Sequence, residues 1–158
     1  MPVEVGVRMN VAPVRTEGQR AALAIVTLMG LEYANEVKRL MKTSRPTGRV
    51  YRRGRKTHVA SAPGQPPAPD TGDLVKSIRT QTRVDEDLVV VEAGSALKKA
   101  RWLEFGAARV TATGATWILF PRPAWGPAMQ TIRANSRGIA VEALRRSGLV
   151  TQEIVRGW

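Results

Sequence analysis

Very few residues of this 158-residue chain belong to the types that perform catalysis or bind metals. The chain has one histidine, His58, and no cysteine. Thiolate nucleophiles, disulfides, cysteine metal sites and two-histidine metal sites within one chain are therefore excluded. His58 follows Arg55, Lys56 and Thr57 in a stretch where little would orient it, so we expect no Ser-His-Asp arrangement.

The acidic residues provide few candidates for catalysis or metal binding. A paired-carboxylate site needs two acids held across a cleft, and the candidates are Glu104, within LEFG, and the run Asp85, Glu86 and Asp87. Three adjacent acids at a turn cannot all face one ion, which makes a solvated turn the better interpretation of the run. The chain also lacks a phosphate loop and a dinucleotide-binding fingerprint. The sequence thus predicts no enzyme, no metal site and no cofactor.

Positive charge is the chemical feature that remains. The formal net charge is +12, and there is no Asp or Glu between Val37 and Pro69, a stretch that holds nine Lys and Arg residues. Such a field attracts anionic partners, either nucleic-acid phosphates or an acidic protein surface. A solvated loop that only keeps the protein soluble is the alternative. The candidate contacts for a partner or for DNA are Arg45, Arg49, Arg52, Arg53, Arg55 and Lys56.

The element before this stretch is a predicted helix over about residues 17–42. One apolar stripe recurs at steps of three and four, through Ala22, Val26, Met29, Tyr33, Val37 and Leu40. Apolar residues off that stripe mean that the helix is covered on more than one side, either by the core of the same subunit or by a neighbouring subunit. The candidate subunit interface comprises Leu23, Leu28 and Leu31.

The charged stretch itself forms an arm over about residues 44–70. VYRR and THVAS could pair as a weak hairpin around Gly54, and four prolines at 63, 66, 67 and 69 keep the second half of the arm extended and outside any central strand. A short helix comes next, with Asp70 or Thr71 as its predicted cap and an apolar face that includes Leu74.

The middle of the chain gives the clearest strand signal. IRTQTRV alternates apolar or threonine residues with polar ones, DED makes a turn, and LVVVEAG returns as an antiparallel partner. The second strand is apolar on both sides, so we expect it to be the more central of the two.

The last third of the chain is predicted to contain two more helices. SALKKARWLEFG forms the first, opened by Ser95 and closed by Gly106, with Ala100, Leu103 and Trp102 facing inward. A loop and a strand at 117–120 come after it, and a final helix covers about residues 124–147. The tail, about residues 149–158, stays apolar to Trp158, so we expect it to dock and we count Trp158 among the candidate interface residues.

Together these elements predict one α+β domain over residues 1–158. Long N-terminal and C-terminal helices would pack on a small antiparallel β-sheet, with an extended basic and proline-rich loop or hairpin beside it. The longest apolar run, residues 21–26, is far too short to span a membrane, and the first residues lack an apolar signal core. We therefore expect a soluble protein without a membrane partner.

Three blocks of the sequence resemble a known family. They are GRVYRRGRKTHVASAPGQPPAPDTGDLVKSI, the WLEFG box after the hairpin, and PRPAWGPAM at the entry to the final helix. In this combination the chain resembles the small head-tail connector proteins, also called neck or tail-completion proteins, of long-tailed bacteriophages and related gene transfer agents. The residues that match the family motifs are Pro63, Gly64, Asp70, Thr71, Gly72, Leu74, Leu103, Glu104, Phe105, Gly106, Pro121, Arg122 and Pro123. The segment AARVTATGATWILF after LEFG is longer than the family pattern.

The resemblance implies a non-catalytic virion protein that assembles in the host cytoplasm and resides in the neck. It would form a homo-oligomeric ring, expected to be a hexamer, between the head-completion or connector protein and the tail tube or tail terminator protein. Packaged DNA in the lumen is a further partner that the basic arm could meet, and an acidic neighbouring protein is the other. The alternative function is a free-standing, sequence-independent nucleic-acid-binding protein that uses the basic segment 38–56.

Overall fold

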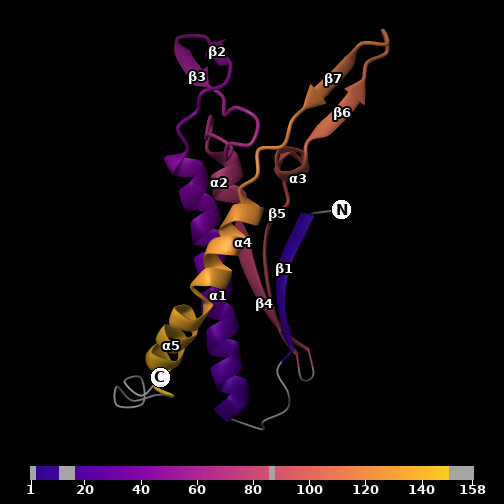
Figure 1. Cartoon of the computed structure of the whole chain (residues 1–158). Helices are drawn as coiled ribbons and strands as arrows, with labels where there is room; N and C mark the ends of the chain where they lie inside the picture. The colour runs from indigo at the N-terminus through magenta and orange to yellow at the C-terminus, as the bar shows by residue number, and fades with distance from the viewer. Residues whose placement is uncertain (1–2, 11–16, 86–87, 150–158) are drawn as a thin grey trace. The chain divides into compact units, whose positions relative to one another are not determined.

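A computed structural model describes residues 3–10, 17–85 and 88–149 of the chain (Figure 1). The predicted α+β class is confirmed, with a long N-terminal helix, C-terminal helices and small antiparallel sheets. The elements are, in chain order, β1 (Val3–Asn10), α1 (Glu17–Thr43), β2 (Val50–Arg53), β3 (Lys56–Val59), α2 (Asp73–Ser77), β4 (Arg79–Asp85), β5 (Leu88–Ser95), α3 (Lys98–Phe105), β6 (Ala107–Val110), β7 (Thr116–Leu119), α4 (Trp125–Ala134) and α5 (Ser136–Arg146).

These elements fall into two compact units, each made of segments that are distant in sequence. The hairpin unit comprises Glu36–Ile78 and Ser95–Ala128, and it contains the β2–β3 and β6–β7 hairpins with α2 and α3. The sheet unit comprises Glu4–Asn35, Arg79–Gly94 and the described residues from 129 onward, which include α5. Helices α1 and α4 contribute residues to both units, and the end residues Val3 of β1 and Ser95 of β5 also belong to the hairpin unit.

The sheet unit is built on a three-stranded sheet in the order β1-β5-β4. Strands β4 and β5 are antiparallel, in a register that runs from Arg79 opposite Gly94 to Asp85 opposite Leu88. The predictions of this hairpin and of a central β5 are confirmed. Of the predicted DED turn, Glu86 and Asp87 lie outside the described residues, and Asp85 ends β4. Strand β1 is an element that the sequence-based prediction missed.

Helix α1 packs on this sheet through the predicted apolar stripe. Ala22 and Val26 form a buried cluster with Val89 and Val91 of β5. Gly30 permits the close approach, since a Cβ built there would lie 2.2 Å from Cγ2 of Val91. The Thr27 hydroxyl also lies 3.5 Å from that of Thr82 in β4. This stripe is therefore core within one chain, and bulk at residue 30 would force the helix away from the sheet.

The hairpin unit differs from the prediction at β6. The segment after LEFG was predicted as a loop followed by one strand, but Ala107–Val110 pairs with Thr116–Leu119 as an antiparallel hairpin. Strand β6 has only four residues, and two of them are alanines with weak strand preference. Its pairing with β7 overrides that preference, which local sequence pattern does not reveal.

Two helix starts also differ from the prediction. The N-cap of α2 is Gly72, with φ 79°, and makes no side-chain cap bond, so the prediction of Asp70 or Thr71 was wrong. The Thr71 hydroxyl instead accepts a 3.4 Å hydrogen bond from the Asp73 N–H, and Thr71 lies one residue before the cap position. The prediction that Ser95 opens α3 was also wrong, because Ser95 is the last residue of β5 and α3 begins at Lys98, with Leu97 as its N-cap. Gly106 occupies its C-cap, as predicted.

The predicted final helix over residues 124–147 is two helices, α4 and α5, separated at Asn135. Asn135 has φ −100° and ψ 6°, outside the ideal helical values, although its N–H still donates to the Thr131 carbonyl at 3.1 Å. Asn is a weak helix former that favours helix starts, and Gly138 weakens the next turn. The tail prediction falls almost wholly outside the described residues, which end at residue 149.

None of the helices within residues 17–85 and 88–149 is long and apolar enough to cross a membrane.

Candidate functional site

The candidate site is the basic hairpin, which we define as β2 and β3 with the preceding residues from Arg45. The strands pair from Val50 opposite Val59 to Arg53 opposite Lys56, as the sequence predicted. Among the predicted contact residues, Arg45, Arg49, Arg52, Arg55 and Lys56 are exposed to solvent. The side chain of Arg53 lies outside the part of the chain that is described. The hairpin therefore presents at least five cations to a partner.

These five cations are not neutralised by carboxylates. Within the described residues, none of them forms an ion pair, and the contact of Arg49 is with an aromatic ring, its guanidinium carbon lying 5.5 Å from the centroid of Tyr51. His58 Nδ1 lies 4.0 Å from Asp70 Oδ1, at the limit of an ion pair. The positive field of the hairpin is thus available to an anion from outside.

The arm that carries this hairpin is closed at its base by two side chains, Gln65 and Ser44. The Gln65 Oε1 atom accepts hydrogen bonds from the Ala62 N–H at 2.9 Å and from both the N–H and the hydroxyl of Thr47 at 3.3 Å. The Ser44 hydroxyl donates to the Pro66 carbonyl at 2.9 Å. The two ends of the arm are therefore held together by side chains, because its prolines have no N–H of their own to donate.

Backbone bonds continue that closure up to the strands. Gly48 N–H donates to the Ala60 carbonyl at 2.8 Å, and Ala60 N–H donates to the Arg49 carbonyl at 2.9 Å. A Cβ on Gly48 would lie 2.7 Å from the Ala60 oxygen. The hairpin thus emerges from a narrow, fixed base and does not hang from a loose loop.

A second set of bonds joins the proline-rich segment to residues some sixty positions later in the chain. The Arg122 Nε–H donates to the buried Ser61 carbonyl at 2.8 Å, and the Gly64 N–H donates to the Pro121 carbonyl at 2.8 Å. The Arg122 N–H donates to the Leu103 carbonyl of α3. Residues from the SAPGQPP, WLEFG and PRPAW blocks therefore meet at one place, which we call the motif junction.

Glu104 completes the motif junction. Its Oε2 atom accepts hydrogen bonds from the N–H groups of Ala124, at 2.8 Å, and Trp125, at 3.1 Å, and its Oε1 atom accepts one from Gly126 at 2.9 Å. These are donors at the start of α4, which have no partner within the helix. Glu104 thus caps a helix that begins about twenty residues later.

Some of the other family-motif residues line a hollow of about 350 Å³ that also includes Leu103. Asp70, Thr71, Gly72 and Leu74 line this hollow with Leu103 and Met41. Pro63 and Gly64 are exposed, and Pro123 is half-buried. Phe105, which ends α3, has 65% of its surface exposed, so it does not belong to the core.

The predicted interface residues of α1 divide between exposed and half-buried positions. Leu23 and Leu31 are exposed, at 39% and 45%, and Leu28 is half-buried. Trp158 lies outside the described residues. The prediction that Trp102 faces inward was wrong, because it is 48% exposed, whereas Ala100 is buried as predicted. Apolar surface is thus present on α1 and, more extensively, around α3.

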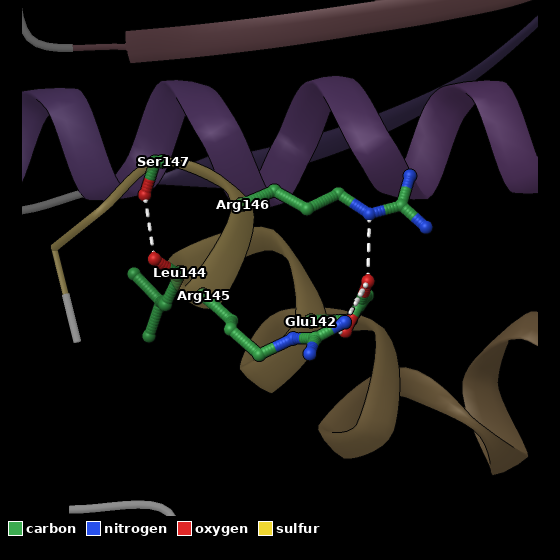
Figure 2. A network of polar contacts seen from close by, with 5 residues as sticks. All are labelled: Glu142, Leu144, Arg145, Arg146 and Ser147. Atoms are coloured by element: carbon green, nitrogen blue, oxygen red, sulfur yellow. Dashed lines mark hydrogen bonds and ion pairs between the residues drawn. The ribbon is translucent and has the colours of Figure 1, made fainter. Parts of the chain in front are cut away.

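The cations of α5 provide a contrast with the basic hairpin. The Glu142 carboxylate accepts hydrogen bonds from Arg145 Nε at 2.9 Å and from Arg146 Nε at 2.7 Å (Figure 2). The hydrogen bonds from Arg145 and then Arg146 lower the pKa of Glu142 from 4.5 to about 2. These arginines are therefore engaged within their own helix.

Among the residues that the structure describes, no group of three or more His, Cys, Asp or Glu side chains is arranged to hold a metal ion.

The contacts of two anchoring residues were not predicted from the sequence. Gln65 is not among the predicted site residues, although it is the one side chain in the SAPGQPP segment with an amide to offer. Glu104 was predicted as a candidate carboxylate and as a family-motif residue, but its bonds to α4 had no signal in the local sequence. In comparisons with family models, curated proteins and solved structures, the chain has no match.

Proposed function

We propose that the chain is a structural protein of the head-tail interface of a tailed phage or related particle, where it forms a ring that joins the head connector to the tail tube. The observation that carries the proposal is the motif junction. The three sequence blocks that resemble neck proteins are far apart in the chain, yet Arg122 contacts both Ser61 and Leu103. A chance resemblance of three separate stretches would not require them to be joined.

The motif junction also explains why such a motif set would serve assembly. The base of the basic hairpin and the start of α4 are fixed by a hydrogen bond that Arg122 donates and by hydrogen bonds that Glu104 and Gln65 accept. An element that is held in place before binding loses less conformational entropy when it docks. The exposed cations would then reach an anionic neighbour in a defined orientation. The proposal assigns no catalytic activity to the chain.

Within a ring, the basic hairpins would form a positive belt by repetition. If the belt faced the lumen, it would contact packaged DNA without reading its sequence. If it faced outward or along the axis, it would dock on an acidic surface of the adjoining connector or tail protein. We favour docking on protein, because a belt that held DNA tightly would hinder its exit.

A free-standing nucleic-acid-binding protein is the second candidate, and the unpaired cations of the basic hairpin favour it. The aromatic side chain beside them is Tyr51, which is 46% exposed. The guanidinium of Arg49 lies over the Tyr51 ring, so base stacking would have to displace that contact. This candidate predicts a monomer whose DNA retention falls steeply between about 50 and 200 mM salt.

Deletion of the gene from its parent phage tests the proposed function directly. We expect full heads and separate tails to accumulate in electron micrographs of the lysate, and a plasmid copy of the wild-type gene to restore joined particles. Normal tailed particles from the deletion strain would overturn the proposal.

A solution experiment separates the two candidates without a phage. The mass of the purified chain is measured by light scattering, and its retention on DNA is measured at about 50 and 200 mM salt. An oligomer supports the ring. A monomer with a steep salt dependence favours the nucleic-acid-binding protein.

A further inference from the structure

The β6–β7 hairpin is the most apolar exposed element among the described residues. Its strands expose Val110 at 68%, Trp117 at 51% and Ile118 at 56%, and Phe120 follows at 56%. Between Gly106 and Pro121, Arg109 is the one charged residue. An exposed apolar hairpin of this kind marks an interaction surface or, if it stays uncovered, an aggregation risk.

The two faces of this hairpin have different shapes. The register places Ala107 opposite Leu119 and Arg109 opposite Trp117, so these four side chains share one face. A hollow of about 590 Å³ is lined by Ala107, Arg109 and Trp117 of that face, by Trp102 of α3 and Thr111, and by Ala108, whose side chain belongs to the other face. We call it the tryptophan hollow.

The opposite face of the same hairpin is an aliphatic projection. Ala108 lies opposite Ile118 and Val110 lies opposite Thr116, which places Val110 and Ile118 together on the face away from Arg109 and Trp117. Both side chains are more than half exposed and branched at Cβ, so they are stiff. We call this pair the aliphatic knob.

The hairpin is held in this shape without a partner. Thr111 N–H donates to the Ala115 carbonyl and Gly114 N–H to the Thr111 carbonyl, both at 2.9 Å, which closes the tip. Glu104, just before β6, is tied to the start of α4, just after β7. The two faces are therefore preorganised, which lowers the entropic cost of association.

We propose that the aliphatic knob of one copy of this chain packs into the tryptophan hollow of the next copy. The occupant is a second copy for two reasons. A knob and a hollow on opposite faces of one element provide both halves of a head-to-tail contact. Repeated contacts of this kind close into a ring when the rotation from one copy to the next allows it. In addition, the chain carries a net charge of +12, so a contact between copies costs least where charged residues are fewest, and Arg109 is the one charged residue between Gly106 and Pro121. The inference rests on the proposed function in that both expect copies of the chain to associate, but it does not depend on where the chain acts.

The test uses the full-length chain and sedimentation velocity over a range of concentrations. The knob variant is Val110→Thr with Ile118→Thr, and the hollow variant is Trp102→Gln with Trp117→Thr. We expect the wild type to be oligomeric and each variant to self-associate on the order of a hundredfold more weakly, the scale of losing interface hot spots. The matched control is Val84→Thr, which makes the same polar change at a 64% exposed strand position of the sheet unit. The control should assemble like the wild type.

Mixing the two variants distinguishes a head-to-tail contact from a like-to-like one. Each variant keeps the half that the other has lost, so an equimolar mixture should form a pair of twice the 17.3 kDa monomer mass. Circular dichroism spectra that match the wild type show that the variants fold. A wild type that stays monomeric at its highest soluble concentration, or a mixture that forms no pair, would overturn the inference.

A parallel variant keeps this result separate from the proposed function. Leu23→Gln with Leu31→Gln polarises the exposed face of α1 and leaves β6–β7 intact. If this variant dissociates while the knob and hollow variants remain oligomeric, the inference is wrong but a ring is still supported. If the hairpin variants dissociate and the gene deletion gives normal particles, the proposed function is wrong and the inference stands.

Discussion

The two hairpins of the hairpin unit have strands of equal length but differ in the charge of their surfaces. Each consists of two antiparallel strands of four residues. The basic hairpin exposes Arg52, Arg55 and Lys56, whereas β6–β7 exposes branched and aromatic side chains. Electrostatic attraction extends over about 10 Å at ordinary salt, whereas apolar surfaces attract each other only where their contact displaces water. The basic hairpin can therefore attract anions from a distance, whereas the β6–β7 hairpin can bind only a surface that it contacts directly.

The hairpins also differ in how they are anchored. The basic hairpin is closed by Gln65, whose oxygen bonds to Thr47 and Ala62. The β6–β7 hairpin is flanked by Glu104 and by the start of α4, which Glu104 caps. The two hairpins therefore depend on different side chains, and removal of one of these side chains should loosen one hairpin more than the other.

Removal of the Glu104 carboxylate should have the largest effect. Glu104→Ala leaves the N–H groups of the buried residues Ala124 and Trp125 without their acceptor, at a cost of about 3 kcal/mol in unfolding free energy. Urea unfolding measures that cost, and Glu104→Gln, which keeps one acceptor oxygen, should lose less.

The same variant tests whether the two anchors are independent. Amide hydrogen exchange followed by mass spectrometry should speed up in β6 and β7 of Glu104→Ala while β2 and β3 keep their wild-type rates. Equal acceleration in both hairpins would mean that they open as one unit.

A glycine at the base of β6–β7 should have the next largest effect. Gly106 has φ 79° and ψ 173°, a region that is essentially restricted to glycine, and a Cβ there would lie 2.7 Å from the Leu119 carbonyl oxygen. Gly106→Ala should therefore lower the unfolding free energy by about 2 kcal/mol.

Its matched control is Gly114→Ala, at the tip of the same hairpin. Gly114 also has a positive φ, of 81°, but a Cβ there would meet open space, so we expect a loss of only about 1 kcal/mol. If the two substitutions cost the same, the contact with Leu119 does not hold the base.

The sequence predicted the elements whose signal is local and missed most of those that depend on distant partners. The stripe of α1 and the alternation of β4 carry enough periodicity to be identified without a structure. Strand β1 also alternates, through Val3, Val5 and Val7, so its signal was present and the prediction overlooked it. Strand β6 and the helix break at Asn135 have weak local signals, so pairing and packing decide them.

The candidate site divides in the same way. The cations of the basic hairpin could be predicted, because a run without acids is visible in the sequence. The anchors could not, since Gln65 bonds to Thr47 and Glu104 to Ala124, partners 18 and 20 residues away. The difference between the faces of the hairpin depends on the register of β6 with β7, which no local pattern contains.

The charge of the basic hairpin gives a prediction of intermediate size. Arg52→Ser with Arg55→Ser should weaken binding to a short DNA duplex about tenfold at low salt and make the logarithmic salt dependence shallower by about 2, near 0.9 for each lost phosphate contact. Fluorescence anisotropy over a salt series measures both. Self-association should not change, because neither arginine belongs to the aliphatic knob or the tryptophan hollow.

The control removes the same charge from another place. Arg145→Ser with Arg146→Ser takes two arginines from α5 that already bond to Glu142, so it should affect DNA binding less than the hairpin variant does (Figure 2). Equal effects of the two variants would mean that net charge, and not the hairpin, determines the binding.

The smallest expected effect tests whether the α5 arginines are engaged in solution. The pKa of Glu142 is lowered to about 2 in the folded chain, so its contribution to stability is complete above pH 4.5 and declines as the pH falls towards 2. Because the group is exposed, the contribution is small and screened by salt. The difference in melting temperature between the wild type and Glu142→Gln should therefore shrink from about pH 6 to about pH 3, and shrink again at high salt. A difference that is the same at both pH values would mean that Arg145 and Arg146 are as available to an anion as Arg52 and Arg55, and the contrast between α5 and the basic hairpin would fail.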